Sequence, residues 1–339
     1  MIHRAIFVGV ILVCVFAVGL CSTLFGADPI RTAVAKSIPL LLQSARTYTE
    51  KRDCFSCHHQ ALVVMAAALA DERGFSVERA LMREQARFTH DYYTNRLDRV
   101  VQGEGVPGGA FSAGYALVPL SLVDWPADET TDALVQFLHR TQEDNASWRI
   151  RGHRPPLEDS DFTATALSLR GLELFARGDH AAERKGRTAR ARSWITTTER
   201  KTTEDKAFHL FGLRWANADA ETLNRTVHEL LSEQRDDGGW AQQSGMASDA
   251  YATGQVLVAL YRSGDVAVTN PAYRLGVEFL LRDQLEDGSW KVATRARPFQ
   301  KYFESGFPHG KSQFISIAAS CWATMAITLT QPHALERRF

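Results

Sequence analysis

One short segment recurs along the 339-residue chain and limits the folds that the chain can adopt. It reads EQRDDGGW at 233–240 and DQLEDGSW at 283–290, so both copies fit Gln-x-x-x-Gly-x-Trp. A third, less regular copy, TQEDNASW at 141–148, has Ala146 in the glycine position. The tryptophans of successive copies are 92 and then 50 residues apart, and 92 is close to two such units. A segment that recurs at such a period indicates a repeat architecture.

Each repeat reads as one amphipathic helix, a turn and a second, less polar helix. The segment LNRTVHELLSEQ (223–234) has apolar residues at three- and four-residue spacing, and SDAYATGQVLVALY (248–261) follows the turn. Second helices of this kind are predicted to begin near His58, Gly109, Asp159, Asp205, Ser248 and Ser312. One amphipathic helix precedes each of them. We therefore predict an all-α fold, an (α/α)6 toroid of about twelve antiparallel helices with the apolar ones inside, rather than an open solenoid.

The charge balance and the N-terminal segment restrict the partners and the location of the chain. Lys+Arg and Asp+Glu both number 39, so the formal net charge is zero and nothing favours binding to nucleic acid. Residues 1–27 begin MIHR and continue into an uncharged apolar run, which predicts a secretory signal peptide, with an uncleaved membrane anchor as the alternative. We predict an exported protein, periplasmic or anchored facing the periplasm, with one toroid domain at 28–339.

The QRDDGGW and QLEDGSW turns resemble those of squalene–hopene cyclases and, more widely, of the terpene cyclase and prenyltransferase superfamily. In that superfamily such QW turns join the outer and inner helices of α/α barrels. The resemblance implies a central apolar cavity that binds an isoprenoid or similar lipid. Hopene cyclases have two barrels and this chain has one, so the resemblance also implies a homodimer or a smaller ligand. Protein prenyltransferases bind zinc through Asp, Cys and His; here Tyr251 stands in the cysteine position, between Asp249 and His309, and we assign no metal.

The segment LEDSDFTATALSL (157–169) resembles the Asp-x-Asp-Asp-Thr-Ala segment that begins an inner helix in these cyclases. The resemblance implies that Asp161 protonates the substrate and that Asp159 tunes the acidity of Asp161. Phe162 stands in the position of the last Asp. An apolar cavity and a neighbouring carboxylate both keep a carboxyl group protonated, as acid-catalysed cyclisation or isomerisation requires. Two alternatives remain open: Asp159 or Ser160 caps the helix, or these side chains bind a ligand.

The stretch EKRDCFSC (50–57) occupies the place of a repeat turn and continues into His58, which gives Cys54-x-x-Cys57-His58. Two thiols at this spacing bond the vinyl groups of a c-type haem, and the adjacent histidine is an axial ligand. The motif predicts haem c at the barrel rim and a redox partner protein. A Cys54–Cys57 disulfide and half of a metal site are the alternatives. An electron-transfer cytochrome with the toroid as scaffold, or a non-enzymatic binding module with that disulfide, therefore competes with a cyclase.

Overall fold

The computed structural model describes residues 28–178, 180–298 and 300–334, and within these ranges it contains helices and no strand. The predicted leader at 1–27 lies outside the described residues. The outer helices are α1 (Pro29–Lys51), α3 (Arg79–Thr94), α6 (Glu129–Thr141), α8 (His180–Thr197), α10 (Ala220–Ser232) and α12 (Pro271–Asp283). The inner helices are α2 (Leu62–Glu72), preceded by the π-helical turn η1 (Cys57–Ala61), α5 (Ala110–Leu122), α7 (Asp161–Phe175), α9 (Thr203–Trp215), α11 (Ala250–Gly264) and α13 (Gln313–Thr328). Two short helices, α4 (Leu97–Val101) and the 3₁₀ turn η2 (Gly310–Ser312), complete the described elements.

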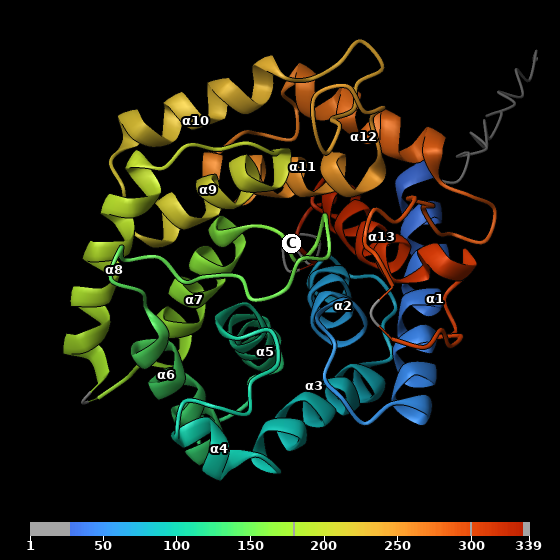
Figure 1. Ribbon diagram of the computed structural model, residues 1–339. Helices are drawn as coiled ribbons and strands as arrows, with labels where there is room; N and C mark the ends of the chain where they lie inside the picture. Colours follow the sequence, from blue (N-terminus) through green and yellow to red (C-terminus); the bar gives the residue numbers. More distant parts are fainter. Residues whose placement is uncertain (1–27, 179, 299, 335–339) are drawn as a thin grey trace, which may run out of the picture.

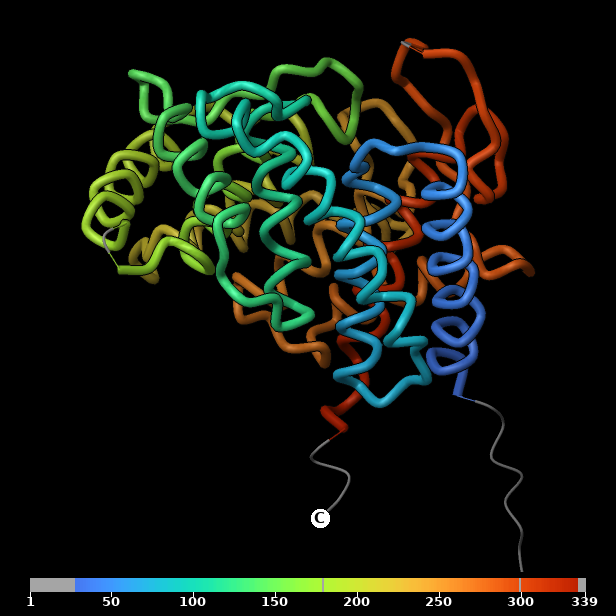
Figure 2. The backbone as a smooth tube through the Cα atoms, turned by 90° about the horizontal axis from the view of Figure 1, so that it is seen from below, coloured from blue at the N-terminus to red at the C-terminus, as the bar shows by residue number. Residues whose placement is uncertain are grey.

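The inner helices form a closed ring, and the outer helices surround it (Figure 1). Contacts run in chain order from α2 through α5, α7, α9 and α11 to α13, which packs against α2 again. Seen from the side, the first and last described residues lie at one end of the barrel and the longest loops at the other (Figure 2). The predicted (α/α)6 toroid is therefore confirmed, and each inner helix begins within two residues of its predicted start when η1 is counted as the start of α2.

Small side chains allow the inner helices to approach one another closely. A Cβ added to Gly114 on α5 would lie 2.7 Å from the backbone carbon of Leu167 on α7. A Cβ added to Gly254 on α11 would lie 2.6 Å from the backbone nitrogen of Ala323 on α13. Glycine at these positions therefore sets the helix spacing within the ring. Among the described helices, none combines the length and the apolar character needed to cross a membrane.

A tryptophan in each QW turn joins the outer and inner helices of its repeat. The indole Nε1 atoms of Trp148, Trp240 and Trp290 each donate to a carbonyl in the last turn of the outer helix, at 2.8 Å in all three repeats. Carbonyls at that end of a helix lack some of their intrahelical partners. The backbone N–H of each tryptophan donates to a hydroxyl on the inner helix. These hydroxyls belong to Thr165, Thr253 and Ser320.

The glutamine of each turn joins one repeat to the next. The Gln234 side chain donates to the carbonyl of Gly238 within its own turn at 2.8 Å and to that of Ala272 on α12 at 2.7 Å. The Gln284 side chain donates to the carbonyl of Ala33 on α1 at 3.0 Å. Because α1 and α12 stand near opposite ends of the chain, this last hydrogen bond helps to close the outer ring.

The less regular first turn predicts a stabilising substitution. Ala146 has φ 77°, in the left-handed region that costs a side-chain-bearing residue roughly 1–2 kcal/mol. We expect Ala146→Gly to raise the free energy of unfolding by about 1 kcal/mol, measured by urea denaturation. The matched control is Gly238→Ala, which should destabilise, because its Cβ would lie 2.6 Å from the Leu275 carbonyl oxygen. An unchanged or lower stability of Ala146→Gly would show that this turn does not carry the expected strain.

Candidate functional site at the barrel rim

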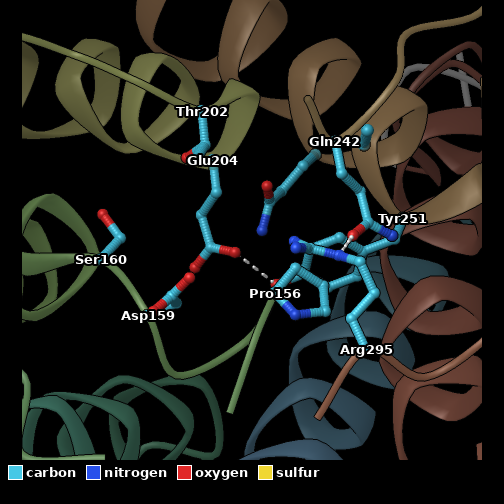
Figure 3. A pocket seen from close by; sticks show the side chains of 10 residues that line it. Pro156, Asp159, Ser160, Thr202, Glu204, Gln242, Tyr251 and Arg295 are labelled. Carbon is cyan, nitrogen blue, oxygen red and sulfur yellow. Dashed lines mark hydrogen bonds between the residues drawn. The ribbon is translucent and has the colours of Figure 1, made fainter. Parts of the chain in front are cut away.

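The N-terminal ends of three inner helices meet at a pocket on the rim of the barrel (Figure 3). The segment before α7 supplies Asp159, α9 supplies Glu204 and α11 supplies Tyr251 and Gln255. Arg295 lines the same pocket from the loop between α12 and α13. The pocket is narrow, with room for about one water molecule. Most of the residues that line it are polar, and the predicted central apolar cavity stays a prediction.

Glu204 is the most deeply placed ionisable group of the pocket. Its side chain extends inward from the first turn of α9, and the residue is only 5% exposed. The Thr163 hydroxyl donates to Oε1 at 2.7 Å, and the Tyr251 hydroxyl donates to Oε2 at 2.9 Å. Burial raises the pKa of the Glu204 carboxyl well above its usual range, although the hydrogen bonds from Thr163 and Tyr251 act in the opposite direction. Glu204 therefore holds a proton under conditions in which an exposed glutamate is ionised.

Buried polar atoms without protein partners lie close to Glu204. The charges of Glu204, Tyr115 and Tyr251 influence one another, so these groups are neighbours. The Tyr115 hydroxyl has no hydrogen-bond partner among the described residues. Gln255 lies beside Tyr251, but neither atom of its amide reaches hydrogen-bond geometry with a described residue. Because unpaired buried polar groups are costly, this region is suited to ordered water or to a polar part of a ligand.

Aromatic rings fill the interior of the same half of the barrel. Phe208 and Phe211 on α9 contact Trp322 on α13, with ring centroids 6.1 Å and 6.3 Å apart respectively. All three side chains are buried. Electron-rich ring faces attract cations, and tryptophan does so most strongly. These rings pack against one another in the interior of the barrel, and Phe208 lies one helical turn after Glu204 on α9.

A chain of hydrogen bonds holds Arg295 at the pocket. Its Nε donates to Gln242 Oε1 at 2.8 Å, and the Gln242 amide donates to Asp249 Oδ2 at 2.9 Å. Asp249 also caps α11 by accepting from the backbone N–H of Ala252. Burial raises the pKa of Asp249 to about 6. The guanidinium group supplies a fixed positive charge where an anionic group of a ligand can bind.

The two aspartates that the sequence predicts as site residues have different contacts in the structure. Asp161 begins α7, and its Oδ1 accepts the backbone N–H of Ile150 at 2.7 Å. Ser316 does the same for Val292 in the last repeat, at 3.1 Å, so this position anchors the backbone two residues after the turn tryptophan. Burial raises the pKa of Asp161, although the residue is only partly buried.

Asp159 lines the pocket and pairs with His153, at 2.5 Å between Oδ1 and Nδ1. The cap of α7 is Ser160, whose hydroxyl accepts from the backbone N–H groups of Phe162 and Thr163. This agrees with the capping alternative for Ser160. The acid role of Asp161 and the tuning role of Asp159 stay predictions.

The Cys54–Cys57–His58 segment lies on the same rim as the acidic segment. The charge of Glu158 acts on the Cys57 thiol, and that of Arg154 acts on both Cys57 and His58. Burial raises the pKa of Cys57 and lowers that of His58 to about 3. Cys54, by contrast, is partly exposed. Both cysteines are free thiols in this structure.

Neighbouring side chains contact the histidine of the motif, which is partly exposed. His58 Nδ1 lies 2.5 Å from His59 Nδ1 and 2.9 Å from the Ser56 hydroxyl. The Phe314 ring lies 5.3 Å from that of His58, and Tyr48 stacks on His59 at 4.7 Å. Aromatic surroundings of this kind suit a porphyrin ring, but Cys57 is only 5% exposed. In this arrangement one of the two thiols is covered, and haem attachment at the segment stays a prediction.

Sequence reasoning missed Glu204. The segment TTEDKAF (202–208) reads as the start of an inner helix, with Thr202 and Asp205 forming a capping box. The capping box explains the presence of Asp205 but not that of Glu204. Glu204 is a charged residue in the first turn of a helix that is otherwise largely buried. A charged side chain at an inner-helix position was the available signal.

Comparisons with known proteins identify the fold. No protein-family model matches the chain. Lanosterol synthase erg7A of Aspergillus fumigatus is 30% identical over 114 residues, a match that spans 34% of this chain and 14% of that enzyme. The type II terpene cyclase MstE from Scytonema superposes with a TM-score of 0.59 at 14% identity, covering 89% of this chain and 98% of MstE. An unsaturated glucuronyl hydrolase from Bacillus sp. GL1 gives a TM-score of 0.56 at 12% identity, over 88% and 96% of the two chains. The chain thus has a terpene-cyclase-like α/α toroid fold.

The raised pKa of Glu204 predicts a specific pH dependence of stability. The folded chain keeps a proton that the unfolded chain releases above pH 4.5, so the wild type loses stability as the pH rises from that value towards the folded pKa. Glu204→Gln lacks this proton. We expect its stability relative to wild type to improve by about 1.4 kcal/mol per pH unit in that window, measured by urea denaturation.

The matched control is Glu221→Gln, because Glu221 is exposed on α10. Its stability curve should run parallel to that of wild type. Asp249 titrates with the same sign up to a pKa of about 6, but it is present in all three proteins and cancels in the difference. A Glu204→Gln curve that also runs parallel to wild type would mean that Glu204 is ionised in the folded protein.

Proposed function

We propose that this chain is an acid-catalysed cyclase or isomerase that acts on an alkene of an isoprenoid or similar lipid, with Glu204 as the proton donor. One observation carries the proposal: a fully buried carboxyl group with a raised pKa lies at the rim, next to an aromatic barrel interior. General acids are effective when they stay protonated at the working pH. Burial supplies that condition for Glu204.

The neighbouring hydroxyl groups suit the transfer of the proton. When the Glu204 proton moves to an alkene carbon, a new C–H bond forms, the π bond breaks and the other carbon becomes a cation. The carboxylate that remains accepts hydrogen bonds from Thr163 and Tyr251, which stabilise its charge. The cyclised or rearranged cation then loses a proton to water, which gives a neutral alkene, and the Glu204 carboxylate takes up a proton from solvent for the next turnover. The reaction needs no oxidant, because no electrons are transferred overall.

The aromatic interior and Arg295 agree with a substrate that has an apolar body and a polar head. Phe208, Phe211 and Trp322 offer ring faces to a carbocation. Arg295 offers a positive charge to an anionic head group at the pocket. MstE has been solved with geranylgeranyl dihydroxybenzoate as its substrate. We extend this chemistry to the present chain and propose a prenyl chain that carries an acidic or polar head.

Substrate entry requires movement, because the pocket now has room for about one water molecule. The segment that connects α6 and α7 crosses the middle of the barrel end in Figure 1. It carries Pro156 and Asp159 of the pocket lining. We propose that this segment moves aside to admit the substrate. A homodimer, in which a second copy extends the hydrocarbon site, stays part of the proposal.

Two variants distinguish the candidate acids. Purified protein is incubated with squalene, geranylgeraniol and geranylgeranyl dihydroxybenzoate, and products are identified by gas or liquid chromatography with mass spectrometry. We expect Glu204→Gln to lower turnover by at least about 100-fold, the usual contribution of a general acid. Asp161→Asn keeps the oxygen that accepts the Ile150 N–H, so it should fold and retain most of the turnover.

The opposite ranking would assign the acid role to Asp161, as the sequence resemblance implies. Glu221→Gln serves as the surface control for both variants. Equal turnover in wild type, Glu204→Gln and Asp161→Asn would rule out acid catalysis by either group. A folded wild type that converts none of the three alkenes would count against a cyclase of this substrate class.

We propose haem attachment at Cys54 and Cys57, with His58 as axial ligand and a redox partner protein, as a second function. The aromatic surroundings of His58 favour it, although the segment has to open before Cys57 can bind a porphyrin. Export belongs to the same proposal, because covalent haem is installed after secretion (the leader lies outside the described residues).

The haem proposal has a direct spectroscopic test. The chain is expressed with a c-type haem maturation system, denatured, and recorded as a pyridine haemochrome. We expect a covalent haem band that is lost in Cys54→Ser/Cys57→Ser and retained in Cys321→Ser, because Cys321 is buried in α13, away from the motif. A colourless wild type would exclude covalent haem, and a thiol titration would then distinguish free thiols from a disulfide.

A further inference from the structure

Three metal-binding side chains gather on the outer wall of the toroid, away from the rim pocket. His139 lies in the last turn of α6, and His180 and Glu183 lie in the first turn of α8. One donor atom from each side chain lies within 4.8 Å of the other two. Across the described residues, no other set of three His, Cys, Asp or Glu side chains meets this condition. Figure 1 shows α6 and α8 side by side at the outside of the ring.

His139 has a buried ring whose two nitrogen atoms both lack a hydrogen-bond partner. The residue is 3% exposed, and neither Nδ1 nor Nε2 is hydrogen-bonded to a described residue. Its Nδ1 lies 3.7 Å from Glu183 Oε1, which is beyond hydrogen-bond distance. An unpaired buried imidazole is costly, and buried polar groups normally have a partner. A bound ligand can therefore supply the partner that the His139 ring lacks.

One separation between donor atoms is close to that of a tetrahedral zinc site, and all three are within 4.8 Å. Zinc binds imidazole nitrogen and carboxylate oxygen at about 2.0–2.2 Å, which puts neighbouring donors roughly 3.3 Å apart. The 3.7 Å between His139 Nδ1 and Glu183 Oε1 is near that value. The two imidazole rings have centroids 5.7 Å apart and an interplanar angle of 26°. Side-chain rotations of exposed Glu183 and half-buried His180 can bring the three donors together.

The surrounding charges both help and oppose metal binding. Glu183 brings a negative charge to the cluster, which favours a metal cation, whereas Arg187 brings a positive charge, which opposes it. Arg187 also pairs with Glu183, at 3.1 Å between Nη2 and Oε1. A metal ion must therefore share Glu183 with Arg187 or use its second oxygen. Removal of the arginine charge should strengthen metal binding.

We propose that His139, His180 and Glu183 bind a divalent transition metal ion, zinc being the best fit, with a fourth position open to water. Two imidazoles and one carboxylate suit zinc better than magnesium or calcium, which prefer oxygen ligands. A metal ion bound at this site would link the first turn of α8 to the last turn of α6. Only Ala191 and Ile195 are buried among the 18 residues of α8, so few apolar side chains hold that helix in place. The site is independent of the rim pocket and of the proposed reaction.

Zinc titration of the untagged, metal-stripped full chain tests the proposal. Competition with a chromophoric chelator should give one zinc ion per chain, and zinc should raise the Tm. His180→Ala should weaken binding by at least about tenfold and abolish the Tm shift. The control His228→Ala removes an exposed histidine on α10 and should bind as wild type does. Arg187→Gln should bind zinc more tightly than wild type.

A second surface variant and cobalt substitution provide independent tests of the metal site. Because His139 is buried and His139→Ala can disturb packing, Glu183→Gln provides a second surface variant, and circular dichroism verifies that each variant is folded. Cobalt substitution should give the absorption of a four-coordinate site in wild type and lose it in His180→Ala. Wild type without stoichiometric zinc binding, or folded His180→Ala and Glu183→Gln that bind as wild type does, would overturn the proposal.

Discussion

In the three repeats that carry a QW turn, the hydrogen bond from the turn tryptophan to the outer helix holds the helix pair together. The indole N–H binds the last turn of the outer helix, and the backbone N–H of the same tryptophan binds a hydroxyl on the inner helix. The glutamine of the turn then reaches the next outer helix, so that each repeat positions its neighbour. The last such contact, from Gln284 to Ala33, closes the ring. Each repeat buries its apolar face only because the next one covers it.

The closed ring explains why an unusual acid can exist at its rim. All inner helices run in the same direction, so their first turns meet at one end, where a side chain pointing inward is removed from water. Glu204 occupies such a position and is matched by two hydroxyl donors, Thr163 and Tyr251, from the helices on either side. Burial of a carboxyl group in this way favours its protonated form. Closure of the ring thus buries Glu204 and raises its pKa, which is the property that the proposed reaction uses.

The sequence predicted the architecture well, because the Gln-x-x-x-Gly-x-Trp pattern and the helical periodicity report local contacts. It also placed the cysteine motif and the acidic segment on one rim, since the inner helices had to run parallel. It did not predict Glu204, because its burial and its partners Thr163 and Tyr251 depend on how three helices meet. The same limit hid the cluster of His139, His180 and Glu183, because His139 lies about 40 residues before the other two in the chain. Motif resemblance drew attention to Asp161, which in the structure bonds to the backbone of Ile150.

The protonation state of Glu204 in the folded protein is the most direct test of this account. Infrared difference spectroscopy of wild type and Glu204→Gln at neutral pH detects the C=O stretching band of a protonated carboxyl group. Asp249, whose pKa is about 6, is largely ionised under those conditions and is common to both proteins. The account predicts a protonated carboxyl band in wild type that is missing in Glu204→Gln. Identical spectra in that region would contradict it, because an ionised Glu204 cannot serve as the acid.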